Sequence, residues 1–211
     1  MAEHIFKKEI EDNYENVVVQ LNFDHYLDPL HIDNGDVTIH QNGQTLPYRL
    51  DIKGSSFFAQ WLLVERHKFY DLQTRQPMSD RYVMVKFSED MLSNPQLRIN
   101  PESILERDSV NGRIIGWANH NDFISPRDVE PWFTFHRGDR PWKTRVLPPS
   151  NTLINNLQHL RNSINFRIRR YNLNEDEIYL RTPLDAEINY GLPLHWLNSD
   201  INQLLDDLPA H

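Results

Sequence analysis

The residues best suited to chemistry gather in one stretch, residues 127–170, where cationic and aromatic side chains interleave. This stretch holds nine Lys or Arg residues and three Asp or Glu residues, a local net charge of +6 in a chain whose net charge is −8. Nucleic-acid binding needs cations for the phosphates and flat aromatic faces for unpaired bases. The stretch therefore predicts a contact surface for nucleic acid or another polyanion. The candidate contact residues are Arg127, Arg137, Arg140, Lys143, Arg145, Arg161, Arg167, Arg170, Trp132 and Trp142.

Two other interpretations of the same stretch stay open. Trp and Arg are enriched at protein–protein hot spots, so the stretch is equally consistent with an assembly surface for an acidic protein partner. Large aromatic residues are also common in cores, and Phe133 and Phe135 lie between the two tryptophans. The arginines would then act as counterions for the flanks, since residues 1–110 carry a net charge of −7 and residues 182–211 carry −5.

The ten histidines are the next candidates, because a chain without cysteine would use His, Asp and Glu for acid–base catalysis. His120 and Asp122 are two residues apart, and His136 follows 16 residues after His120. If the two histidines faced each other across a cleft near Arg137 or Lys143, they would serve as base and acid in phosphodiester cleavage. A His-dependent phosphodiesterase or nuclease is therefore a further alternative, although histidines on the surface or in a core are the commoner outcome.

Several classes of chemistry lack their sequence signals. Zero cysteines exclude disulfides, thiolate zinc sites, iron–sulfur clusters and a cysteine nucleophile. No His-x-x-x-His or His-Glu-x-x-His spacing occurs, and neither the Gly-rich dinucleotide motif, the phosphate loop nor the Gly-x-Ser-x-Gly elbow is present. We therefore expect no metal and no cofactor, and we favour a protein that is not an enzyme.

The amino terminus and the apolar runs bear on location. The first ten residues, MAEHIFKKEI, lack the apolar middle region of a signal peptide, which predicts a cytoplasmic protein. The longest apolar run, Trp61-Leu62-Leu63-Val64, is far below the ~20 residues that a membrane helix needs. We expect a soluble protein that does not contact a membrane, and we interpret Arg137-Gly138-Asp139 as a turn rather than an adhesion motif. The sequence does not indicate an oligomeric state.

The clearest local structure is predicted near the amino terminus. Residues 17–24 alternate between apolar and polar, the period of a half-buried strand. Asn42-Gly43 follows a second alternating run and is the preferred pair for a type I′ hairpin turn. Pairing around this turn predicts a sheet edge or a bulge at Pro47. The predicted partners are Gln41 with Gln44, His40 with Thr45, Ile39 with Leu46, Val37 with Tyr48 and Asp36 with Arg49.

The middle of the chain gives weaker patterns. Residues 57–70 fit either a helix or a buried strand, and we favour the strand because a turn-rich stretch and a second strand, residues 81–87, follow as in a meander. Asn111-Gly112 predicts a hairpin of residues 104–110 with residues 113–118. Residues 119–151 carry five prolines and no sustained period, which is typical of an ordered but irregular segment.

Helical patterns follow toward the carboxyl end. Apolar residues recur with helical spacing between Asn151 and Asn172, although Ile164, Phe166 and Ile168 could instead begin a strand. Residues 178–181 form a short strand candidate. Ser199 is the expected cap of a last helix whose buried face is Ile201, Leu204, Leu205 and Leu208.

Together these patterns predict an α+β fold, with a mainly antiparallel β-sheet in the N-terminal two-thirds and helices toward the C-terminus. A length of 211 residues fits one domain, with a division into a β-rich part, 1–147, and a helical part, 148–211, as the alternative. The expected function is binding of nucleic acid or another polyanion through residues 127–170.

Overall fold

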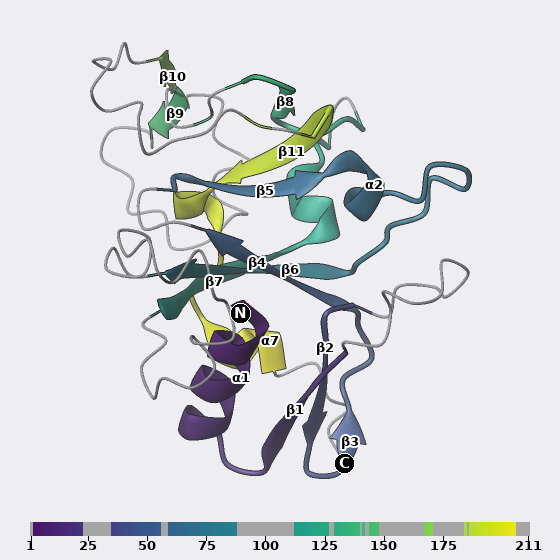
Figure 1. The fold of residues 1–211 in the computed structure, drawn as a ribbon, viewed down its shortest axis with the longest axis vertical. Helices are drawn as coiled ribbons and strands as arrows, with labels where there is room; N and C mark the ends of the chain where they lie inside the picture. The colour runs from purple at the N-terminus through teal and green to yellow at the C-terminus, as the bar shows by residue number, and fades with distance from the viewer. Residues whose placement is uncertain are drawn as a thin grey trace, which may run out of the picture. The chain divides into compact units, whose positions relative to one another are not determined.

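The structure of the chain is a computed structural model. It describes residues 2–22, 35–55, 59–87, 112–126, 129–139, 141, 144–147, 167–170, 184 and 186–205. The described part is rich in β-sheet, with few helices, which confirms the α+β class (Figure 1). The chain divides into two compact units, which are described separately below. Unit 1 comprises Met1–Ala59, Met78–Trp117 and Ser199–His211; unit 2 comprises Gln60–Pro77 and Ala118–Asn198.

Unit 1 is built on a mixed β-sheet. Its described strands are β1 (Val17–Leu21), β2 (Val37–Gln41), β3 (Gln44–Thr45), β4 (Leu50–Ser55), β6 (Arg81–Phe87) and the greater part of β7 (Gly112–Asn119). Their order is β1-β2-β4-β6-β7, with β3 paired to β2. Strands β1 and β4 run antiparallel to β2, whereas β4 and β6 are parallel to each other.

The parallel pair corrects the prediction of a mainly antiparallel sheet. Parallel neighbours need a long crossover connection, and residues 60–77 of that connection belong to unit 2. Strand β6 therefore pairs with β4 and not with the strand that directly precedes it, so the predicted meander is wrong. Both faces of β6 are covered: Tyr82, Val83, Met84 and Val85 are all buried.

The N-terminal hairpin follows the predicted pattern as far as Leu46, whose N–H donates to the carbonyl of its predicted partner Ile39 at 2.9 Å. Strand β1 is present and buries Val17 and Val19, while Val18 between them is 56% exposed. Asn42 and Gly43 have φ angles of 51° and 79°, the positive values that a type I′ turn requires. A Cβ at Gly43 would meet nothing within 4 Å, so the backbone angle rather than crowding favours glycine there.

Beyond Leu46 the predicted register is wrong. Val37 pairs with Leu50 rather than Tyr48, because the chain leaves the ladder at Pro47, which lacks an N–H. The interruption at Pro47 agrees with the predicted bulge. Arg49 does not pair with Asp36; its guanidinium lies 3.1 Å from the carboxylate of Asp80.

Helix α1 (Ala2–Asn13) belongs to unit 1 and was not predicted. With α7 (Ile201–Leu205) near the other end, helices lie at both ends of the chain and not only toward the C-terminus. Helix α1 buries Ala2, Ile5, Phe6 and Ile10 in one cluster with side chains of the sheet. Full burial of an Ile or Phe side chain contributes roughly 1.5–3 kcal/mol, so this face holds the helix in place.

Polar side chains of α1 bind the two outer strands of the sheet. The N–H of Val19 on β1 donates to Glu11 Oε1 at 2.8 Å, and its carbonyl accepts from Lys7 Nζ at 2.6 Å. On β7 the N–H of Ile114 donates to Glu9 Oε2 at 2.7 Å. Burial raises the pKa of the Glu9 carboxyl, whereas hydrogen bonds from Lys7 and Val19 outweigh burial and lower the pKa of Glu11. One helix thus satisfies edge groups of both outer strands, which would otherwise offer themselves to another chain.

The last predicted helix is confirmed as α7, in which Leu204 and Leu205 are buried as expected. Asp200 rather than Ser199 caps it, because Asp200 Oδ1 accepts the N–H of Asn202 at 3.0 Å.

Three side chains from the sheet region, Tyr48, Arg81 and Trp117, hold α7, and we call them the helix clamp. Tyr48 Oη and an Arg81 guanidinium nitrogen both donate to the carbonyl of Leu204, and Trp117 Nε1 donates to the carbonyl of Asp200. The guanidinium of Arg81 lies 3.7 Å from the ring centroid of Tyr48, which is a cation–π contact. Backbone carbonyls at the helix ends are thereby satisfied by buried or half-buried donors.

Unit 2 contains two small antiparallel sheets and several short helices (Figure 1). One sheet has the order β5-β11-β8, and the other pairs β9 with β10. The described elements are β5 (Trp61–Glu65), α2 (Arg66–Phe69), the 3₁₀ helix η2 (His120–Phe123), β8 (Thr134–His136), β9 (Thr144–Leu147), β10 (Arg167–Arg170), β11 (Ile188–Pro193) and the 3₁₀ helix η5 (Leu194–Trp196).

Aromatic side chains form much of the core of unit 2. The ring centroid of Trp61 lies 5.0 Å from those of Phe133 and Phe135 in edge-on arrangements. Phe69 is fully buried and contacts Phe123 and Tyr190. Edge-to-face pairs of this kind add roughly 0.5–1.5 kcal/mol each beyond their buried area.

Several predictions for unit 2 are corrected in part. Residues 57–70 contain both a strand, β5, and a single helical turn, α2. Residues 119–151 are less irregular than expected, since they contain η2, β8 and β9. Strand β10 replaces the last turn of the helix expected up to Asn172 and agrees with the alternative that a strand begins near Ile168. Strand β11 was not predicted.

Other predictions lie outside the described residues. These are the strand at residues 104–110, most of the helix from Asn151, the short strand at residues 178–181, and the division between residues 147 and 148. They stay predictions. Residues 113–118, the predicted hairpin partner of residues 104–110, form a strand within β7.

Candidate functional site

The strand pair β9–β10 brings four arginines of the basic stretch together. Arg145 is the direct cross-strand partner of Arg169, and Arg170 is the partner of Thr144. Residues two apart on a strand share a face, so Arg167 lies on the face that carries Arg145 and Arg169. Like charges directly opposite each other destabilise a sheet. We call Arg145, Arg167 and Arg169 the arginine face.

Arg137 lies in a separate turn of unit 2. Its N–H donates to the carbonyl of Glu187 at 3.0 Å, and its side chain is exposed. Gly138 follows with a φ of 83°, and Asp139 Oδ2 accepts the N–H of His136 at 2.7 Å. The Arg137-Gly138-Asp139 tripeptide is therefore a turn, as predicted, closed by its own aspartate.

The aromatic residues of the basic stretch are largely core residues. Phe133 and Phe135 are each 8% exposed and pack on Trp61, so their faces are not open to a base. Trp132 is half-buried and meets Trp196 edge-on, with ring centroids 5.8 Å apart. Stacking on unpaired bases therefore receives no support from Phe133 and Phe135.

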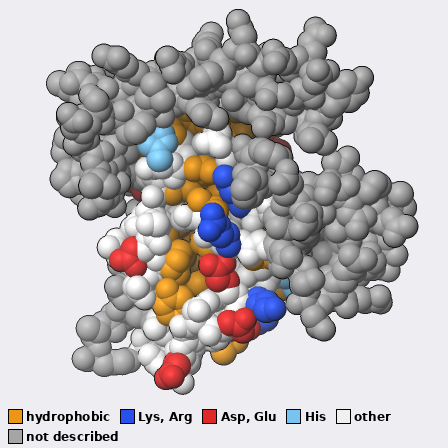
Figure 2. Space-filling view, turned by 90° about the vertical axis from the view of Figure 1, so that its left-hand side faces the viewer, with side chains coloured by type: hydrophobic (Ala, Val, Ile, Leu, Met, Phe, Trp, Pro, Cys, Tyr) orange, Lys and Arg blue, Asp and Glu red, His pale blue; other side chains and the backbone are white. Residues whose placement is uncertain are grey.

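The remaining binding candidates lie outside the described residues: Arg127, Arg140, Lys143, Arg161 and Trp142. On the face of the molecule drawn in Figure 2, described acidic and basic side chains lie beside one another rather than in patches of one sign. Among the candidate residues that the structure describes, Arg145, Arg167 and Arg170 lie in the strand pair of β9 and β10.

The three residues of the catalytic alternative occupy different environments. His120 is 6% exposed and stacks on Phe69, with ring centroids 4.0 Å apart. Asp122 accepts the N–H of Asn119 at 2.8 Å, which is the role of a helix-capping residue. His136 is exposed and lies beside Asp139. Core packing accounts for His120 and capping for Asp122, and neither residue lines the cavity described below.

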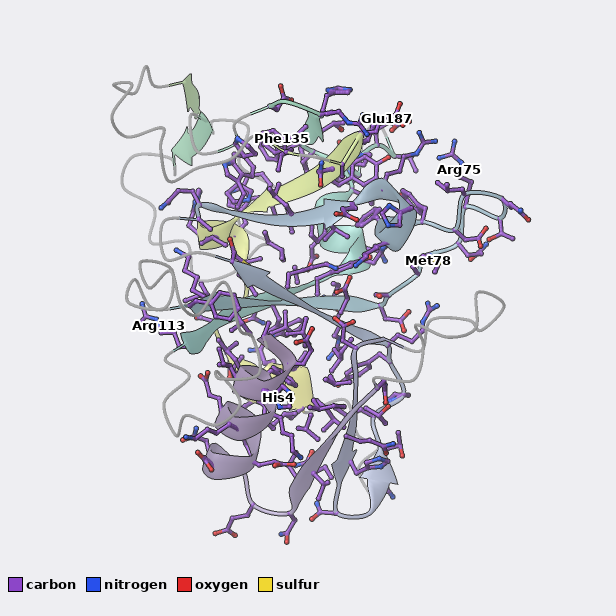
Figure 3. The ribbon with its side chains drawn as sticks, in the orientation of Figure 1. His4, Arg75, Met78, Arg113, Phe135 and Glu187 are labelled. Atoms are coloured by element: carbon purple, nitrogen blue, oxygen red, sulfur yellow. The ribbon has the colours of Figure 1, made fainter. Side chains whose placement is uncertain are left out.

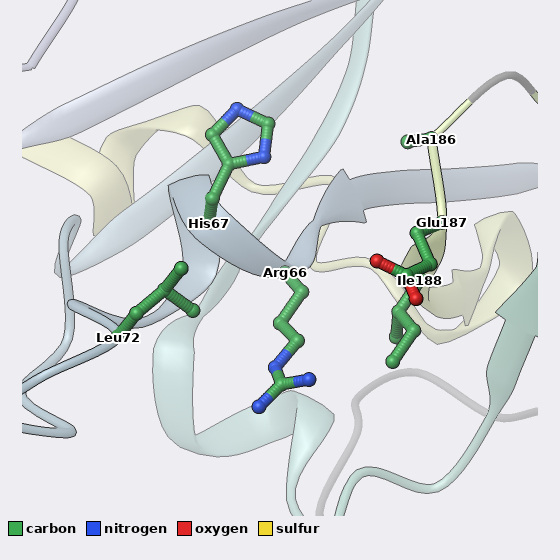
Figure 4. Close-up of a pocket in the computed structure, with 6 residues that line it drawn as sticks. All are labelled: Arg66, His67, Leu72, Ala186, Glu187 and Ile188. Atoms are coloured by element: carbon green, nitrogen blue, oxygen red, sulfur yellow. The ribbon is translucent and has the colours of Figure 1, made fainter.

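A cavity of about 450 Å³ lies in unit 2 between α2 and the start of β11 (Figure 4). Sequence analysis did not identify it. In the view of Figure 4, the side chain of Arg66 lies between Leu72 on one side and Glu187 and Ile188 on the other. The lining residues are Arg66, His67, Leu72, Ala186, Glu187 and Ile188.

Short-range hydrogen bonds fix the walls of this cavity. The α2 turn is closed by the Tyr70 N–H, which donates to the carbonyl of Arg66 at 3.0 Å. Asp71 Oδ1 accepts from the N–H groups of Gln73 and Thr74, which shapes the turn that presents Leu72. Figure 3 labels Arg75, which lies on the same turn, and also Phe135 in β8 and Glu187, which directly precedes β11. On the opposite wall, the Asn189 amide donates to the carbonyl of Ala186 at 3.2 Å.

The charged groups of the cavity differ in their partners. His67 Nε2 lies 3.2 Å from Glu65 Oε2. Arg66 Nε is buried without a hydrogen-bond acceptor among the described residues. Within that same part of the chain, the carboxylate of Glu187 forms no hydrogen bond or ion pair. A cation and an anion thus line one cavity without neutralising each other.

Among the described residues, no group of three or more His, Asp or Glu side chains is placed to hold a metal ion. No helix among them is long and apolar enough to cross a membrane.

Comparison of the chain with protein-family models, with curated proteins and with solved structures found no match.

Proposed function

We propose that this chain binds a polyanion, with single-stranded nucleic acid as the first candidate, and that the arginine face of β9 and β10 is the central contact. The observation that carries the proposal is the register that sets Arg145 directly opposite Arg169, with Arg167 two residues away on the same face. Repulsion between these cations weakens the strand pair when nothing is bound. A phosphate chain supplies several negative charges at once, and guanidinium groups bind phosphate oxygens with paired hydrogen bonds.

The test is fluorescence anisotropy with a labelled single-stranded oligonucleotide at two salt concentrations. If three arginines contact phosphates, log K falls with log salt with a slope of about −2, so affinity drops roughly twentyfold between 50 and 200 mM salt. The triple variant Arg145→Gln, Arg167→Gln, Arg169→Gln should lose most of this slope. Absence of binding at ~50 mM salt would overturn the proposal, since non-specific binders associate under those conditions.

A matched control removes the same charge elsewhere. Lys8, Lys68 and Arg75 are exposed and lie outside the basic stretch, so their joint replacement by Gln changes the net charge equally. The proposal requires this control to keep the wild-type salt slope. If both triple variants weaken binding alike, only overall charge matters and the arginine face is not the site. Capture of an acidic protein that depends on the same arginines, with no nucleic-acid binding, would favour the assembly alternative.

A further inference from the structure

The cavity between α2 and β11 is chemically unlike the arginine face. Its volume of about 450 Å³ lies within the range of small-molecule sites, roughly 300–1,000 Å³, and toward its lower end. The carboxylate of Glu187 would repel a polyanion. The guanidinium of Arg66 would equally repel a simple cation. The cavity therefore suits a ligand of modest size that carries both charges.

The Arg66 side chain supplies the anion-binding half. Its Nε–H is buried and has no acceptor among the described residues, so the protein leaves part of its hydrogen-bonding capacity unmet. Because no acceptor in the described part of the chain engages Nε and Arg66 lines the cavity, the guanidinium is available to an incoming carboxylate. A guanidinium fork also matches the geometry of a carboxylate better than that of a single-atom anion.

Glu187 and the apolar wall supply the other half. The carboxylate of Glu187 is exposed at the cavity and makes no ion pair within the described chain, so it is available to an ammonium group. Leu72, Ala186 and Ile188 provide apolar contact, and Leu72 is 58% exposed. From these three features we infer that the cavity binds an α-amino acid with an aliphatic side chain, its carboxylate on Arg66 and its ammonium on Glu187.

The test is isothermal titration calorimetry of the full chain with leucine and two derivatives that each lack one charge. N-acetyl-leucine lacks the ammonium and leucinamide lacks the carboxylate, so each should bind at least tenfold more weakly than leucine. This comparison uses the wild-type protein and holds even if a variant fails to fold. The inference is overturned if neither leucine, isoleucine nor methionine binds at ~10 mM, or if both derivatives bind as tightly as leucine.

Variants then assign each charge to its residue. Arg66→Gln and Glu187→Gln should each weaken leucine binding at least tenfold. Lys68→Gln, from the same helical turn, and Glu130→Gln, an exposed carboxylate outside the lining, are the matched controls and should leave it unchanged. Leucinamide should bind Arg66→Gln as well as it binds the wild type, because the group that Arg66 recognises is absent. Equal loss of leucinamide and leucine binding in Arg66→Gln would overturn the assignment.

Discussion

Asp36, just before β2, forms a carboxyl pair with Asp51 on β4, and this pair makes unit 1 sensitive to pH. Asp36 Oδ2 accepts the N–H of Ile52 at 2.7 Å, and Asp51 Oδ1 lies 2.7 Å from Lys53 Nζ. Burial, followed by the charge of Asp51 and a hydrogen bond to it, raises the pKa of Asp36 from 3.8 to about 7. The substitution Asp36→Asn keeps an oxygen for the Ile52 N–H and replaces the shared proton with an amide hydrogen.

The sign and size of the effect follow from this shift. The folded-state pKa of Asp36 lies above its unfolded value, so the folded chain binds the proton more tightly. Its contribution to stability is fully present below about pH 4 and is lost as pH rises through 7. Three pKa units correspond to about 4 kcal/mol, but Asp36 is partly exposed and solvent screening reduces this, so we expect about 2 kcal/mol.

Urea denaturation of both proteins between pH 4.5 and 8 measures the prediction. The excess in free energy of unfolding of Asp36→Asn over the wild type should grow as pH rises from 4.5 and reach about 2 kcal/mol at pH 8. Asp12→Asn removes the same charge from an exposed position of α1 and should differ by less than about 0.5 kcal/mol throughout. A difference between Asp36→Asn and wild type that stays constant with pH, or favours the wild type at pH 8, would refute the reasoning.

Two other predictions concern the hairpin turn and the buried histidine. Gly43→Val should lower the free energy of unfolding by about 1 kcal/mol or more, because a β-branched residue resists the positive φ. Gly43→Asn should lower it less, because asparagine tolerates a positive φ. Equal melting temperatures for the two variants would contradict the turn assignment. His120→Ala should lower the free energy of unfolding, measured by urea denaturation, by about 2 kcal/mol because it leaves a cavity beside Phe69. His136→Ala, at the surface, should leave the free energy of unfolding nearly unchanged. The reverse order would mean that His120 is not a core residue.

Local patterns in the sequence predicted the elements whose partners are close in the chain. The alternation of residues 17–21 and the Asn42-Gly43 turn depend on neighbouring residues, and both are present. The register failed at Arg49 because its partner, Asp80, lies far along the chain. The local alternation of apolar and polar residues contains no information about a contact between residues so far apart in the sequence.

Helix α1 also shows which features the sequence predicts and which it does not. Ile5, Phe6 and Ile10 have helical spacing, so the helix itself could have been predicted from the spacing of its apolar residues. The hydrogen bond from the Ile114 N–H to Glu9 was not predictable, because these residues are far apart in the sequence and meet only in the folded unit. The parallel pairing of β4 with β6 has the same origin, since a crossover through another unit leaves no local signature.

The candidate sites were predictable in composition but not in arrangement. The basic stretch was evident from its charge, yet the helical period before Asn172 favoured a helix over the strand that sets Arg169 opposite Arg145. Arg66 and Glu187 carried no signal, because each is an ordinary charged residue in sequence. They meet at one cavity only because α2 packs near the start of β11.

The helix clamp joins residues that are synthesised early to residues that are synthesised late. Tyr48, Arg81 and Trp117 are made early, but their acceptors on Asp200 and Leu204 follow only after nearly all of unit 2. Until those residues leave the ribosome, unit 1 holds a buried arginine without its helical carbonyl and an apolar surface without Leu204 and Leu205. Contacts of such long sequence separation form slowly, and incomplete units of this kind aggregate readily. A nascent chain of this protein is therefore exposed to aggregation until residues 200–205 have emerged and packed on the rest of unit 1.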